Sequence, residues 1–233
     1  MVEFKFEHQD FKCPEALNDR ALNDNSLGDI RFRKLLGPKQ WSALPAAVRT
    51  RFSKRVKGGE STIYKGYVVK TEMNQAGRIF ANALRMIGAP LPLYRHNAEA
   101  PAIVTVTEDA DYKGQFWSRQ YGPGNKKGHG FPQTIQSSKQ FSGPTGLEEY
   151  IGYSIGMTLR LAVEDETLAF YSDRYFLRTM GKRLLLPKWL SHLALRVGHA
   201  DHGDGWFEFS LELEHPWFGT LMDQRVMFRD AAS

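Results

Sequence analysis

The sequence has few of the features that hold a protein together without a packed core or anchor it to a membrane. Its 233 residues include one cysteine, Cys13, which excludes an intramolecular disulfide or a paired-cysteine metal site and favours a reducing compartment. No apolar run approaches the roughly 18 residues that a membrane-spanning helix requires, so we expect no transmembrane segment. The first ten residues carry charges where a signal peptide would be apolar. We therefore expect a cytoplasmic protein without a targeting segment.

The common catalytic motifs are also missing. The chain has no Walker loop, HExxH or GxSxG sequence, which excludes the commonest nucleotide-binding, zinc-protease and hydrolase classes. The stretch GPGNKKG at 122–128 is similar to a loosened dinucleotide-binding glycine motif, but the residues after it begin a strand rather than a helix. We therefore expect a cationic hairpin loop there and no bound cofactor.

The positive charge is concentrated in one segment. The chain has 31 Lys and Arg against 26 Asp and Glu, and residues 30–56 hold eight of the bases and no acid. Such a segment could contact phosphates, acidic lipid head groups or an acidic partner. It lacks a recognised nucleic-acid-binding fold and interleaved stacking aromatics, so we expect no nucleic acid partner. The favoured interpretation is a solvated helix face whose aliphatic stems cover the core.

The domain organisation follows from a change of pattern along the chain. Residues 1–29 are polar and rich in Asn and Asp, which predicts a loosely ordered N-terminal arm. We expect residues 30–233 to form a single β-rich domain whose N-terminal segment, residues 30–90, is helical. Its helices are predicted near 30–37, 45–56 and 76–88, the first ending at a Gly-Pro pair.

The apolar faces of these helices predict how they pack. Val48, Phe52 and Val56 share one face of the second helix, so Phe52 is predicted to be buried against the β domain. The third helix carries a wide apolar stripe that includes Ile79 and Phe80, and we expect this stripe to be buried too.

From residue 101 onward the apolar residues recur with a period of 2. Residues 151–163 alternate over the longest stretch, and Gly152 and Gly156 would allow this predicted strand to bend. Similar alternation at 193–197 and 207–213 predicts further strands, with turn signals between them. We expect an α+β, β-rich fold, in which about 8 to 10 strands form a strongly curved antiparallel meander sheet or a partly open up-and-down β-barrel. Two or three N-terminal helices would close one end or pack on the concave side.

Several ordered motifs resemble a known bacterial family. They are FRKLLG and WSALPAAVRTRF within 32–52, WSRQYG at 117–122, LEEYIG at 147–152, LRLAVEDETLAF at 159–170, LPKWL at 186–190 and DGWFEFSLELEHPWFG at 204–219. Together they are similar to the family known as domain of unknown function 4166. The resemblance implies relatives that occur alone or fused to a Rossmann-type dehydrogenase or epimerase domain, which makes a dehydrogenase-type protein a possible partner. It implies no reaction, only the pattern residues Trp117, Arg119, Glu149, Trp189 and Gly219.

Four histidines fall within residues 192–215 and suggest a metal site, but strand parity argues against one. His199 shares the inward parity of its apolar neighbours, whereas His192 points the opposite way and His202 lies at a turn. We therefore expect no metal ion, and a core or cavity histidine at position 199. Asp201 has the same parity and could hold the His199 ring, which makes the two residues a candidate catalytic acid–base pair.

Arg119 lies between Trp117 and Tyr121 on one face of a predicted strand. An inward arginine needs a carboxylate, which Glu149 or an anionic ligand could supply. The alternative is an outward arginine stacked on aromatic rings at a barrel rim.

Three functions share this architecture. The first is a module that binds a small apolar, amphipathic or lipid-like ligand in the interior. The second is an isomerase-like enzyme that uses the acid–base pair in the same cavity, and the third is an accessory domain with a filled core that contacts a dehydrogenase-type partner. The candidate ligand-binding residues are Trp117, Arg119, Glu149, Tyr153, Met157 and His199. The first function predicts a cavity of at least roughly 300 Å³ bordered by the odd-numbered positions of 151–163.

Overall fold

Alternating apolar and polar residues build eleven strands in the described part of the chain. The computed structural model describes residues 29–54, 56, 58–86, 88, 91–92, 99–122, 133–152, 155–180, 182–187 and 192–230. The strands are β1 (Ser61–Met73), β2 (Ala100–Asp109), β3 (Gly114–Tyr121), β4 (Gln133–Gln140), β5 (Glu148–Ile151), β6 (Ile155–Glu164), β7 (Thr167–Thr179), β8 (Lys182–Leu185), β9 (Ala194–Gly203), β10 (Trp206–His215) and β11 (Gly219–Asp230). The helices within these described residues are α2 (Arg31–Ala43), α3 (Ala46–Ser53) and α4 (Gln75–Met86).

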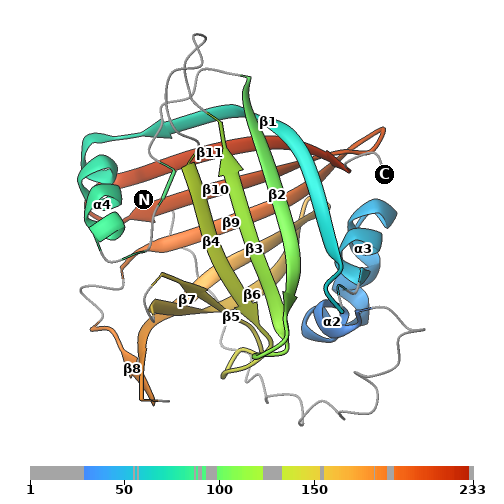
Figure 1. The fold of residues 1–233 in the computed structure, drawn as a ribbon, viewed down its shortest axis with the longest axis horizontal. Coiled ribbons are helices and arrows are strands. Elements are labelled where there is room, and N and C mark those ends of the chain that lie inside the picture. Colours follow the sequence, from blue (N-terminus) through green and yellow to red (C-terminus); the bar gives the residue numbers. More distant parts are fainter. Residues whose placement is uncertain are drawn as a thin grey trace.

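The strands form one antiparallel sheet that closes on itself. Their order is β6-β5-β4-β3-β2-β1-β11-β10-β9-β7-β8, and an additional pairing of β6 with β7 completes a ring of ten strands. Strand β8 pairs with the end of β7 and stays outside this ring. Figure 1 shows the ring as a barrel of long, tilted strands. The predicted β-rich, antiparallel fold is confirmed, and the sheet is closed rather than open.

The strand register shows which side chains point into the barrel. Val104 on β2 lies opposite Arg119 on β3, which in turn lies opposite Ile135 on β4. On the other side of the ring, Leu168 on β7 lies opposite His199 on β9. Side chains directly opposite on neighbouring strands share a face of the sheet. Since Val104, Ile135 and Leu168 are buried, this face is the interior of the barrel.

Helices α2 and α3 cover one end of the barrel, beside β1 and β6 (Figure 1). Helix α2 packs on β6 and α3 on β9. Phe52 on α3 is buried, and its ring contacts those of Phe32, Phe170 and His199. The prediction that Phe52 packs against the β domain is confirmed. The break predicted after the first helix is also found, because Gly37 inside α2 has φ 75° and interrupts the helical backbone.

Residues 151–163 do not form one strand, so that prediction is wrong. Strand β5 ends at Ile151, Gly152 has φ 62°, and β6 begins at Ile155, which pairs with Ile151. A left-handed backbone is readily adopted by glycine, and here it turns the chain into a hairpin. Ile151 and Ile155 lie opposite each other on the two strands and so share one face, which is why the sequence pattern looks uninterrupted. Tyr153 lies outside the described residues.

Helix α4 is the other departure from expectation. It packs on β11 through its small residues, and Gly77 and Ala81 are the buried positions of the helix. Ile79 and Met86 are 73% and 88% exposed, so the predicted burial of the whole apolar stripe is wrong. The helix docks through the side where glycine allows close approach to the backbone, so Ile79 and Met86 point away while Phe80 packs, partly buried, against the cluster of Leu213, Leu221 and Met222.

None of the helices in the described residues combines the length and the apolar character needed to cross a membrane.

Replacing Gly77 with Ala should destabilise the protein, although Gly to Ala in a helix usually stabilises by about 1 kcal/mol. A Cβ at this position would collide with the backbone carbonyl oxygen of Leu221. We expect a net loss of at least about 1 kcal/mol in the free energy of unfolding, measured by urea denaturation. Asn82→Ala on the exposed side of α4 is the control and should change stability little. An unchanged or higher stability of Gly77→Ala would contradict the close docking of α4.

Candidate functional site

Arg119 points into the barrel and meets a carboxylate there. Its Nη2 atom donates hydrogen bonds to Glu149 Oε1 at 3.3 Å and to Ser137 Oγ at 3.2 Å. Lys139 on β4 donates to the same Glu149 oxygen at 2.9 Å. Of the two alternatives that the sequence left open, the structure shows the inward arginine paired with Glu149. The three charged side chains form an ion cluster, Arg119–Glu149–Lys139, on the inner wall of the barrel.

Burial and neighbouring charges together determine the pKa values of the ion cluster. The side chains of Lys139 and Glu149 are each 6% exposed, whereas that of Arg119 is 24% exposed. Burial alone would raise the pKa of the Glu149 carboxyl, but the charges of Lys139 and Arg119 outweigh it and hold this pKa at about 2. Burial lowers the pKa of Lys139, and the nearby Arg119 adds to that effect while Glu149 opposes it. With all three groups ionised, the ion cluster has two positive charges against one negative charge.

Trp117 forms an apolar wall beside the ion cluster. The Lys139 ammonium lies 4.8 Å from the centroid of the Trp117 ring, and the guanidinium carbon of Arg119 lies 5.9 Å from it. The indole Nε1–H donates to Gln115 Oε1 at 3.3 Å, so the ring orientation is fixed. Met157 is buried too and lies opposite Glu149, where it joins the apolar cluster beneath α2.

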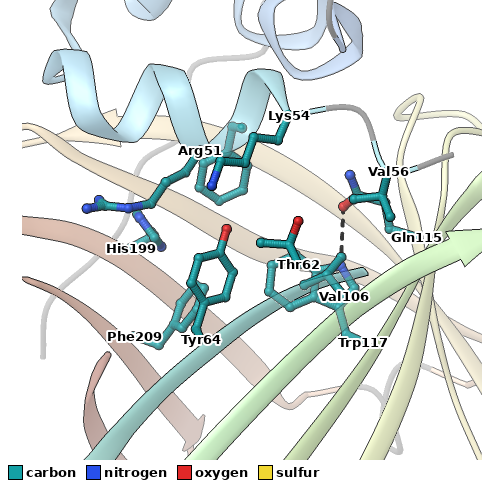
Figure 2. A pocket seen from close by; sticks show the side chains of 11 residues that line it. Arg51, Lys54, Val56, Thr62, Tyr64, Val106, Gln115, Trp117, His199 and Phe209 are labelled. Carbon is teal, nitrogen blue, oxygen red and sulfur yellow. Dashed lines mark hydrogen bonds between the residues drawn. The ribbon is translucent and has the colours of Figure 1, made fainter. Parts of the chain in front are cut away.

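A pocket lies beneath α3, between the helix and the inner face of the barrel. Its walls come from α3 and the residues after it, and from β1, β2, β3, β9 and β10 (Figure 2). The cavity measures about 30 Å³, enough for a few atoms the size of a water molecule. No residue of 151–163 lines it, so the larger cavity predicted along those residues stays a prediction.

His199 lines this pocket with a ring that is 1% exposed. It stacks on Phe207 at 4.7 Å between centroids and contacts Phe209 and Phe52 edge-on. Neither ring nitrogen has a hydrogen-bond partner among the described residues. Burial lowers the pKa of His199 to about 3, with a further contribution from the charge of Arg51, so the imidazole is neutral at physiological pH.

Asp201 does not hold the His199 ring, so the predicted acid–base pair is wrong. Its Oδ1 atom accepts a hydrogen bond at 2.9 Å from Nη1 of Arg51, a residue of α3. Arg51 offers Asp201 a charge-assisted bond, which is stronger than a bond from a neutral imidazole. The shared parity of His199 and Asp201 on one strand could not reveal that Arg51, on a helix distant in sequence, would bind the Asp201 carboxylate instead.

Arg51 also corrects the interpretation of the basic segment. Its side chain is 6% exposed, and its guanidinium carbon lies 4.2 Å from the centroid of the Phe207 ring. This arginine is therefore part of the barrel interior and not of a solvated helix face. Sequence reasoning missed Arg51 and Lys139 as interior residues. Lys139 shares the parity of Ile135 in its strand, a signal that becomes useful once the β3–β4 register is known.

The other candidate histidines stay apart from this pocket's lining. His192 and His215 lie with their ring centroids 6.5 Å apart, and His215 also contacts Trp217 and Phe218. Within the described ranges, no group of three or more His, Cys, Asp or Glu side chains is arranged to hold a metal ion.

Replacing Glu149 with Gln removes the carboxylate that neutralises Lys139 and Arg119 while keeping the size of the side chain. Because a buried charge loses its partner, we expect the free energy of unfolding to fall by about 3–5 kcal/mol in urea denaturation at pH 7. The control is Glu164→Gln, which breaks a more exposed ion pair with Arg196 and should cost at most about 1 kcal/mol. Equal effects of the two substitutions would show that the ion cluster contributes no more than a surface pair.

His199 should make stability depend on pH in a defined window. Its pKa is about 3 when folded against a model value of 6.5, so below pH 6.5 the unfolded chain takes up a proton that the folded chain does not. The contribution of His199 to the free energy of unfolding is fully present above pH 6.5. It declines toward pH 3, by up to about 1.4 kcal/mol per pH unit. In the His199→Phe variant, this decline of the free energy of unfolding between pH 6.5 and pH 5 should disappear. The control is His202→Phe, on the exposed part of β9, which should keep the decline. The measurement is a series of urea denaturations, and an unchanged slope in His199→Phe would refute the prediction.

Comparison with known proteins places the chain in a family. None of the curated proteins matches it. A solved structure assigned as a thioesterase II from Thermobifida fusca YX is similar over 80% of this chain and 84% of its own, with 10% identity and a TM-score of 0.23, which is too low to support any conclusion. Residues 44–228 match the family described as domain of unknown function (DUF4166). The match spans most of the chain and includes Trp117, Arg119 and Glu149, so this protein belongs to the DUF4166 family.

Proposed function

We propose that this protein binds a small amphipathic molecule inside the barrel, with an acidic group of the ligand held at Arg119. The observation that carries the proposal is the state of Arg119 itself. Its side chain points into the barrel and yet is 24% exposed, and it shares a single carboxylate with Lys139. A guanidinium that is directed inward, accessible and only partly neutralised is suited to a carboxylate or similar acidic group.

The apolar part of the ligand would lie along neighbouring inward side chains. Ile151, Val197 and Leu211 point into the barrel by register, and all three are only partly buried. A close-packed core would bury such side chains fully. Their residual exposure supports space in the interior, and Trp117 supplies a rigid aromatic wall next to Arg119.

The two other candidate functions have less support. The enzyme hypothesis needed His199 and Asp201 as a pair, and Asp201 is bonded to Arg51 instead. The accessory-domain alternative has one observation in its favour, the exposed apolar residues Ile79 and Met86 on α4. Exposed apolar side chains are common on protein surfaces, so this observation favours a protein partner only weakly.

The proposal is tested with straight-chain carboxylates of increasing length and the matching alcohols. We expect saturable binding of hexanoate, octanoate and decanoate to the full chain, followed by Trp fluorescence and calorimetry. Affinity should rise about fourfold per added methylene, because each buried methylene contributes about 0.8 kcal/mol. Native mass spectrometry of the purified protein should show a single bound ligand.

Two variants separate binding at Arg119 from a general effect of charge. Arg119→Gln leaves Lys139 to neutralise Glu149 and should weaken decanoate binding about tenfold or more while leaving decanol binding unchanged. The control is Arg160→Gln, which removes an exposed guanidinium paired with Asp173 and should not affect binding. If none of the carboxylates binds, or if Arg119→Gln binds decanoate like the wild type, the proposal is wrong.

A further inference from the structure

The pocket beneath α3 contains polar atoms whose hydrogen-bonding capacity is unused. Both nitrogens of His199 and the Nε atom of Arg51 are buried and have no hydrogen-bond partner among the described residues. Buried polar atoms in native proteins are nearly always hydrogen-bonded, and the exceptions call for an explanation. These three atoms belong to side chains that line a cavity of about 30 Å³, so an occupant of the cavity would explain them.

The two side chains are held in place, which makes the pocket a built site. Asp201 accepts a hydrogen bond from Nη1 of Arg51, and the guanidinium lies over the Phe207 ring. His199 is fixed by the rings of Phe207 and Phe209. Figure 2 draws His199 beside Arg51 at one edge of the pocket. Donors that are fixed before a ligand arrives lose little entropy on binding.

The pocket is rich in positive charge and in donors. Arg51 and Lys54 line it, and no carboxylate of the described residues does. Asp201, which pairs with Arg51, is not among the residues that line the cavity. Figure 2 shows the hydroxyls of Tyr64 and Thr62 pointing toward α3, on the side where Lys54 lies. Such surroundings favour a small group that carries negative charge and accepts hydrogen bonds.

We propose that the pocket beneath α3 is a binding site for a carboxylate group, whose oxygens accept the Nε–H of Arg51 and an N–H of His199. A carboxylate is planar and small enough for a cavity that holds only a few atoms. The neutral imidazole provides one N–H donor, and its other nitrogen can accept a hydrogen bond from a water molecule that shares the cavity. Trp117, Phe209 and Val106 provide apolar walls for the carbon attached to the carboxylate.

This site is distinct from the one proposed at Arg119, which does not line the pocket. Trp117 contacts both, since it lines the pocket and lies beside the ion cluster. The inference therefore goes beyond the proposed function, and either of the two can fail without the other.

The test is an NMR titration of the isotope-labelled full chain with sodium acetate at constant ionic strength. The readouts are the ring nitrogens of His199 and the indole N–H of Trp117. We expect saturable shifts of both signals. Sodium phosphate in the same buffer should give none, because its larger dianion does not fit the cavity.

Variants assign the effect to the two donors. His199→Phe fills the same space without nitrogens and should weaken acetate binding about tenfold or more, as reported by Trp117. Arg51→Lys keeps a cation for Asp201 but lacks the Nε–H, and it should weaken binding similarly. His202→Phe and Arg160→Gln, both at exposed positions away from the pocket, are the controls and should titrate like the wild type. Linear shifts without saturation, saturation by phosphate, or full acetate affinity in His199→Phe would each overturn the proposal.

Discussion

The pairing of β6 with β7 is the contact on which the rest of the molecule depends, because it closes ten strands into a ring. A closed ring leaves none of its ten strands as a free edge and forces every second residue of each strand into the interior. Arg119, Lys139 and Glu149 are among these inward residues, so the fold places three charges where water is scarce. Mutual neutralisation is then required, and the shared Glu149 oxygen provides it. The ion cluster is thus a consequence of closure, while the accessibility of Arg119 is an additional property that a purely structural cluster would not need.

The end of the barrel beneath α3 is shaped by two side chains of that helix. The consecutive residues Arg51 and Phe52 both enter the barrel. Phe52 packs against Phe170 in the apolar core, and Arg51 pairs with Asp201. Because Asp201 is engaged in this way, it does not bond to the His199 ring, whose nitrogens have no partner among the residues that the structure describes. The same helix therefore completes the core and creates the unused hydrogen-bonding capacity of the pocket.

Local pattern was sufficient to predict much of this arrangement, and tertiary contacts account for the rest. Period-2 alternation predicted the inward position of His199 correctly, since side chains alternate along any strand, but it left open which way Arg119 points. The same alternation hid the turn at Gly152, because an alternating pattern does not indicate where one strand ends and the next begins. Glu149 was identified as a possible partner of Arg119, whereas Lys139 was not, since its place depends on the register between two strands. Arg51 carried no local signal for burial at all, as its environment is made by β9 and β10.

The distribution of charge links the two candidate sites. Outside residues 30–56 the chain has 23 bases and 26 acids, so most of the molecule is slightly acidic. Inside the barrel, the ion cluster with all three groups ionised has two cations for one carboxylate, and Arg51 of the pocket beneath α3 is paired with Asp201. A small acid that enters the barrel is stabilised by donors already in place, in surroundings of low dielectric constant where each such interaction is stronger than in water.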